Sequence, residues 1–111
     1  MIKMQALTLR SLESQAHPQT KMVFWFLFAS SRGAASRVKI VRALQKQPYN
    51  AHQLSQELSL DYKAIKHHLD TLEKNNMIGK FDAHYGATYF LSTLFEENNT
   101  VFDEITTKLN F

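Results

Sequence analysis

The chain has 111 residues, a length that accommodates one domain with a few flanking helices. Hydrophobic residues make up 44% of it and charged residues 21%, which is ordinary for a globular protein and excludes a chain disordered by composition. Because it contains no cysteine, disulfides, cysteine–zinc sites and thiol redox chemistry are excluded.

Positive charge is concentrated in the middle of the chain, which has a formal net charge of +3. Residues 32–80 carry nine Lys or Arg and four Asp or Glu, whereas residues 81–111 carry one Lys and five acids. This division is typical of a protein that meets a polyanion with one face, although an ordinary solvated surface produces it about equally often.

The longest apolar run covers residues 22–29 and is far shorter than the roughly 20 residues of a membrane-spanning helix. The segment before it lacks the layout of a signal peptide. We therefore expect a soluble, cytoplasmic protein without a membrane partner.

The N-terminal third is predicted to hold a polar arm and an apolar helix. Residues 1–18 form the arm, and Pro18 favours the start of a helix. Residues 19–30 are apolar nearly all round, which indicates a helix buried by its own domain or by a partner subunit. A short buried strand is the alternative, because Phe and Trp favour strands.

Three helices are predicted in the central segment, and they span residues 34–47, 50–59 and 61–75. The first ends before Pro48, which cannot continue a helix. The second begins with a capping-box pair, Asn50 and Gln53. The third is capped by Asp61, and its narrow apolar stripe consists of Ile65, Leu69 and Leu72.

A hairpin and a last helix follow. Met77–Asp82 and Thr88–Ser92 are the predicted strands, with Gly86, His84 and Tyr85 near the tip between them. From Thr93 onward apolar residues recur at helical spacing. They are Phe95, Val101, Phe102, Ile105 and Leu109.

This order of elements predicts a mainly α fold with a small β-hairpin: a winged helix-turn-helix with flanking N- and C-terminal helices. We divide the chain into the arm (1–18), the winged domain with its preceding apolar helix (19–92) and a C-terminal helix for dimerisation (93–111). The helix 61–75 would enter the major groove of DNA, and the hairpin 77–92 would be the wing.

The candidate DNA-binding residues are mainly the donors on the outward side of the helix 61–75, because phosphates and base edges accept hydrogen bonds. These residues are Tyr62, Lys63, Lys66 and His67, together with Arg37 on the first central helix and Lys80 on the wing. His68 lies beside the apolar stripe, and we interpret it as a packing residue.

Residues 31–78 resemble the winged-helix domain of the ArsR-like transcriptional regulators, and their archaeal branch most of all. The motifs that carry the resemblance are Arg32-Gly33, Pro48-Tyr49-Asn50-Ala51, Asp61-Tyr62-Lys63 and His67-His68-Leu69. The similarity extends over about residues 22–92. It implies DNA contacts from Lys63, Lys66 and His67 and from Tyr62, and dimerisation through the terminal helices. The turn between the second and third helices often carries Gly in this family, and here it holds Ser59.

The dimer surface is predicted on apolar residues of the terminal helices, although the C-terminal helix could instead fold back on its own domain. The candidates are Phe24, Phe28, Phe95, Val101, Phe102, Ile105 and Leu109.

The function predicted from these features is that of a homodimeric transcriptional regulator whose partners are double-stranded DNA and a second copy of itself. Two alternatives remain open: an architectural DNA-binding protein with little sequence preference, and a protein-interaction module with residues 24–28 as partner surface. We expect no enzyme and no cofactor, because no phosphate loop, metal triad or Ser/His/Asp arrangement is present. A metal at His67 and His68 would need a third ligand from elsewhere.

Overall fold

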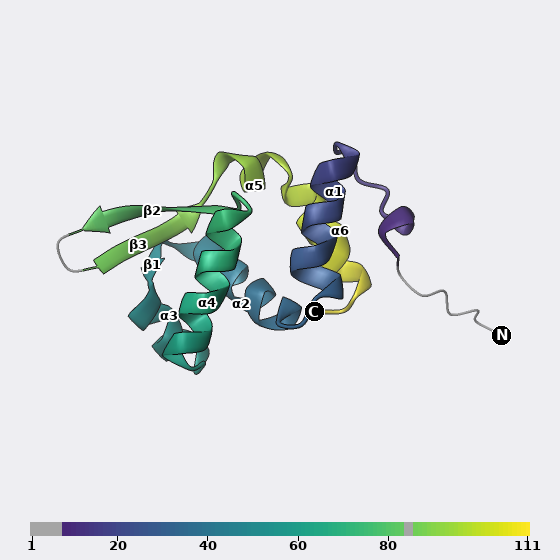
Figure 1. The fold of residues 1–111 in the computed structure, drawn as a ribbon. Helices are drawn as coiled ribbons and strands as arrows, with labels where there is room; N and C mark the ends of the chain where they lie inside the picture. Colours follow the sequence, from purple (N-terminus) through teal and green to yellow (C-terminus); the bar gives the residue numbers. More distant parts are fainter. Residues whose placement is uncertain (1–7, 84–85) are drawn as a thin grey trace.

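The computed structural model describes residues 8–83 and 86–111 (Figure 1). Its regular helices and strands are α1 (Pro18–Trp25), α2 (Ala34–Lys46), β1 (Tyr49–Asn50), α3 (Ala51–Leu58), α4 (Tyr62–Lys74), β2 (Ile78–Ala83), β3 (Gly86–Leu91), α5 (Thr93–Glu97) and α6 (Asn99–Lys108). A 3-10 turn at Leu9–Ser11 precedes α1, and a π-helical turn at Phe26–Ser30 continues it. The predicted winged helix-turn-helix is confirmed.

Local chemistry sets the ends of the two helices in the helix-turn-helix. The Asn50 side chain accepts a hydrogen bond from the backbone N–H of Gln53 at 2.7 Å, and the Gln53 side chain accepts one from the Asn50 N–H at 2.9 Å. This is the predicted capping box. The Asp61 carboxylate accepts from the N–H of Ala64 at 3.2 Å and so caps α4. Between the helices Ser59 has a φ of 53°, a left-handed conformation that glycine adopts at lower cost.

The sheet contains one strand more than the sequence predicted. Strands β2 and β3 form the expected antiparallel hairpin, in which Lys80 lies opposite Tyr89. Strand β1 pairs with the other edge of β3, giving the order β1-β3-β2. A strand of two residues is too short to show a periodic pattern, so the sequence did not predict β1. His84 and Tyr85 lie outside the described residues.

The segments at either end of the winged domain are helical, with a break that was not expected. Residues 18–30 form a helix, and the alternative of a strand is wrong. The C-terminal helix is divided at Asn98 into α5 and α6. Strand β3 ends at Leu91, because the Ser92 side chain caps α5 by accepting from the N–H of Phe95 at 3.0 Å.

Four phenylalanines join the N-terminal helix to the C-terminal ones. Phe28 and Phe102 meet edge to face with ring centroids 5.0 Å apart, and Phe24 stacks on Phe95 at 5.7 Å. Figure 1 shows α1 and α6 side by side at the end of the molecule opposite the hairpin. Each of the four rings is at most 1% exposed, so this Phe cluster forms part of the chain's own core.

The Phe cluster corrects the predicted dimer surface. Burying a large apolar side chain contributes roughly 1.5–3 kcal/mol, so these rings are secured within one chain. Leu109 is only half-buried. The predicted dimer residues that are instead buried in the core of the chain itself are Phe24, Phe28, Phe95, Val101, Phe102 and Ile105. The C-terminal helices α5 and α6 fold back on their own domain, which is the alternative that the sequence left open for this segment.

A carboxylate holds the segment before α1 against α6. Glu104 accepts hydrogen bonds from the N–H of Glu13 at 2.7 Å and of Ser14 at 3.0 Å. It also accepts from the Ser14 hydroxyl at 2.6 Å and the Lys108 ammonium at 2.8 Å. Burial alone would raise the pKa of Glu104, but these four donors outweigh it and lower the pKa to about 2.

None of the helices in residues 8–83 and 86–111 combines the length with the apolar character that crossing a bilayer demands.

The Glu104 contacts predict a pH-dependent contribution to stability. Because the pKa is lowered from 4.5 to about 2 on folding, the contribution is complete above pH 4.5 and is lost as the pH falls toward 2. We expect Glu104→Gln to melt below the wild type at pH 7, with a difference that shrinks below pH 4.5. Calorimetry across this range checks it.

Asp103→Asn is the matched control, since the Asp103 side chain is exposed and accepts a hydrogen bond from Asn99 at 3.3 Å. A melting difference for Glu104→Gln that stays constant from pH 7 to pH 3 would contradict the assignment.

Candidate nucleic-acid interface

Helix α4 is seated on the core by one narrow stripe. Ile65, Leu69 and Leu72 are completely buried, as their i, i+4, i+7 spacing predicted. The opposite side of α4 carries Tyr62, Lys63, Lys66 and His67, and we call it the outward arc. Lys63 and His67 are exposed there, and Tyr62 is 49% exposed. The N-terminal half of α4 therefore presents two cations, Lys63 and Lys66, with a phenol and an imidazole beside them.

Lys66 leans from α4 toward the wing. Its ammonium lies 3.4 Å from the hydroxyl of Tyr89 on β3 and 5.9 Å above the centre of that ring. The hydrogen bond to Tyr89 is the main reason why the pKa of Lys66 is raised, and the charge of Asp70 adds to it. Lys66 thus remains a cation at any physiological pH, and Tyr89 fixes its position.

A small cavity of about 200 Å³ lies between the first turn of α3, helix α4 and the wing. Lys66, Tyr62 and Tyr89 line one part of it, and His52 of α3 lines another. His52 is exposed, and the sequence analysis did not select it, because only the fold brings the start of α3 beside α4. The cavity gives the outward arc a polar notch with room for a phosphate group.

Lys80 is directed toward α4. Its ammonium lies 3.7 Å from the Glu73 carboxylate, and both side chains are about one-third exposed. An exposed pair of this kind contributes little stability, but it partly neutralises the cation. Lys80 is the third of the six residues of β2, so it lies nearer the base of the wing than its tip.

Arg37 is not a surface residue, and its predicted role in DNA contact is wrong on this ground. It is 3% exposed. Its guanidinium donates to the Leu27 carbonyl at 2.8 Å, to the Ser31 hydroxyl and to the Arg32 carbonyl at 3.3 Å. Burial lowers the pKa of Arg37, but the guanidinium remains charged.

A sequence signal for this burial existed. Arg37 lies three residues after Ala34 and four before Val41, which places it on the buried stripe of α2.

His68 connects α4 to the buried Arg37 of α2. Its Nδ1 lies 3.3 Å from the Arg37 guanidinium, and the packing role predicted for this residue is confirmed. Burial, and then the charge of Arg37, lower the pKa of His68, so that it is neutral at pH 7. Gly33 faces the ring with a φ of 87°, and a Cβ added there would lie 2.6 Å from it. Glycine at this position therefore allows α4 to approach α2.

The rings of the two adjacent histidines of α4 are tilted by 58° to each other, with centroids 5.6 Å apart. In the part of the chain that the structure describes, no three His, Asp or Glu side chains gather closely enough to hold a metal ion.

Comparison with known proteins agrees with this geometry. Residues 35–80, from α2 to the first residues of β2, match the family model for bacterial regulatory proteins of the arsR family. The segment that contains the outward arc is therefore similar to the helix-turn-helix of that family. A search of curated protein sequences finds no significant match.

Solved structures share the fold over most of the chain. HlyU from Vibrio cholerae in its reduced form is 22% identical, with a TM-score of 0.62 over 82% of this chain and 88% of HlyU. ZitR from Lactococcus lactis is 16% identical, with a TM-score of 0.52 over 83% and 74% of the two chains. The transcriptional regulator BldR from Sulfolobus solfataricus is 15% identical, with a TM-score of 0.53 over 83% and 72%.

Proposed function

We propose that this chain, which carries an arsR-type helix-turn-helix, is a DNA-binding transcriptional regulator that acts as a homodimer. The observation that carries the proposal is the exposed, cationic N-terminal half of α4. Lys63 is free in solvent there, and Lys66 is held at the edge of the wing. Proteins that read double-stranded DNA through a helix-turn-helix use this part of the second helix.

In this proposal α4 enters the major groove and the hairpin 77–92 lies along the adjacent backbone. Lys63 and Lys66 contact phosphates, while Tyr62 and His67 reach base edges or phosphates. The notch lined by His52, Lys66 and Tyr89 receives a phosphate oxygen from the strand that passes between α4 and the wing. Lys80 supports this contact from the base of the wing.

The dimer surface is proposed on the outer side of the N-terminal helix. Met22 and Phe26 lie four residues apart on one face of α1 and its π-helical continuation, and they are 56% and 51% exposed. Single exposed apolar side chains are common on protein surfaces, but two large ones side by side on one helix face are typical of an interaction surface. The acidic side chains of α5 and α6 would remain away from the DNA, which repels them.

We also propose membership of the archaeal branch of the ArsR-like regulators and action in the cytoplasm. The support is the set of motifs at Arg32-Gly33, Asp61-Tyr62-Lys63 and His67-His68-Leu69. In the structure two of them meet, because His68 packs against Gly33.

Replacing Lys63 and Lys66 by alanine tests the DNA-binding role. The affinity for a duplex should fall, and the slope of log affinity against log salt should decrease by about two for each bound protomer. Fluorescence anisotropy on a labelled duplex at several salt concentrations measures both quantities. Lys74→Ala is the control, since Lys74 is the last residue of α4, at the opposite end of the helix from Lys63. An unchanged slope in the double variant would refute the assignment of α4.

Replacing Met22 and Phe26 by glutamate tests the dimer surface. We expect monomers by sedimentation velocity and a helical content equal to that of the wild type, because both side chains are exposed. Phe81→Glu on the wing, where the side chain is 68% exposed, should leave the dimer intact. A dimer that survives the double substitution would place the interface elsewhere. Aspartate at Phe102 or Ile105, by contrast, should unfold the chain.

Selection of bound sequences from random duplex DNA distinguishes this function from an architectural one. A regulator with two recognition helices about 34 Å apart should enrich an inverted repeat. Uniform recovery would favour an architectural protein. Negligible binding at physiological salt would favour a protein-interaction module.

A further inference from the structure

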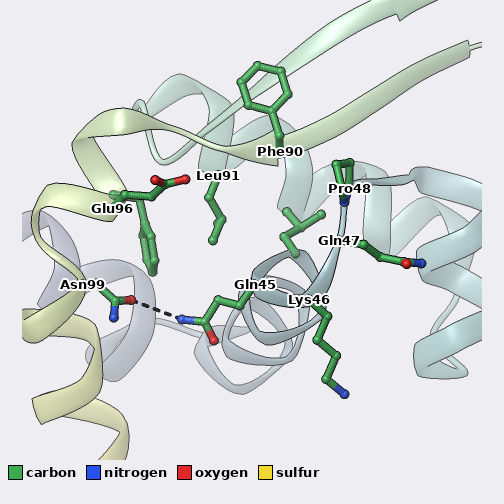
Figure 2. Close-up of a pocket in the computed structure, with 10 residues that line it drawn as sticks. Gln45, Lys46, Gln47, Pro48, Phe90, Leu91, Glu96 and Asn99 are labelled. Carbon is green, nitrogen blue, oxygen red and sulfur yellow. Dashed lines mark hydrogen bonds between the residues drawn. The ribbon is translucent and has the colours of Figure 1, made fainter.

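A second concavity lies away from the outward arc. It is a solvent-open cavity of about 640 Å³ between the end of α2, the end of β3 and the start of the C-terminal helices. This volume is within the range of about 300–1,000 Å³ that small-molecule sites occupy. Figure 2 shows its lining residues, which come from α2 and the loop after it, from the strand β3, and from α5 and α6.

The base of the cavity is apolar. Leu44 is 6% exposed and Phe95 is completely buried, so both are part of the core. Leu91 and Phe90, at the end of β3, are half-buried and extend this surface outward. The cavity can therefore take up the flat apolar body of a ligand.

The polar part of the lining favours a ligand that donates hydrogen bonds. Pro48 has no N–H to offer the Leu44 carbonyl in the last turn of α2, where the negative end of the helix dipole lies. Glu96 is exposed at the rim, and in Figure 2 its carboxylate is directed toward Leu91. The Gln45 amide donates to the Asn99 side chain at 3.2 Å.

Lys46, a cation among the lining residues, does not offset this preference for a hydrogen-bond donor. In Figure 2 the Lys46 side chain extends away from the other residues of the cavity, and Lys46 is exposed. The charge that faces the cavity is thus the Glu96 carboxylate, next to the end of a helix dipole of the same sign.

We propose that this cavity binds a small aromatic amine, with its ring on Leu44 and Leu91, above the buried Phe95, and its ammonium group near Glu96 and the end of α2. Such a ligand would join the wing strand β3 to α5 and α6. Its binding would then change the affinity of the outward arc for DNA, a consequence that rests on the proposed function.

Nuclear magnetic resonance of the full chain tests the site with tryptamine as the probe. We expect tryptamine to shift the methyl resonances of Leu44 and Leu91 and the side-chain amide resonances of Gln45 and Asn99. Indole-3-propionate, which carries a carboxylate in place of the ammonium, should bind more weakly. Glu96→Gln should weaken tryptamine binding about two- to fivefold, as expected for an exposed charge pair. Glu97→Gln is the matched control, since Glu97 is exposed but does not line the cavity.

No shift at millimolar tryptamine, or shifts confined to another part of the chain, would overturn the site. Equal binding of the two probes would overturn its preference for amines. The binding measurement needs no DNA, so a chain that fails to bind DNA would refute the proposed function and not this site. Unchanged DNA affinity at saturating tryptamine would overturn the regulatory consequence alone.

Discussion

The seat of α4 on the core is the constraint on which the rest of the structure depends. Ile65, Leu69 and Leu72 are fully buried at i, i+4, i+7 spacing, so the helix cannot rotate without exposing at least one of them. A stripe this narrow leaves most of the helix circumference in solvent and determines which side chains occupy it. The cationic arc is the geometric complement of that stripe. The proposal that this chain binds DNA depends on this arrangement.

Arg37 secures the orientation of α4 relative to the terminal helices. Its donors satisfy the Leu27 carbonyl at the end of the N-terminal helix and the Ser31 hydroxyl in the following turn, and its guanidinium also reaches His68 on α4. A buried charge is tolerated only when its hydrogen bonds are made, and here they reach three separate segments. Arg37 thus affects the outward arc through His68, without belonging to it.

Because the Phe cluster is buried within one chain, the stability of the fold does not depend on association with a second copy. Phe24, Phe28, Phe95 and Phe102 close the core inside one chain, so the fold does not require a partner to cover them. An interface between copies would instead use side chains that remain exposed, such as Met22 and Phe26. The acidic C-terminal helices and the basic α4 then lie on different parts of the surface, as a protein that meets a polyanion with one face requires.

The sequence by itself determined the local structure: the capping box at Asn50, the cap at Asp61, the stripe of α4 and the hairpin. These depend on residues a few positions apart, whose geometry the backbone dictates. Only the tertiary structure decided which apolar surface covers which. It buried the Phe cluster within the chain, enclosed Arg37, added β1 to the sheet and brought His52 and Tyr89 beside Lys66. Contacts between residues distant in sequence depend on the packing of whole elements, which the spacing within one element does not encode.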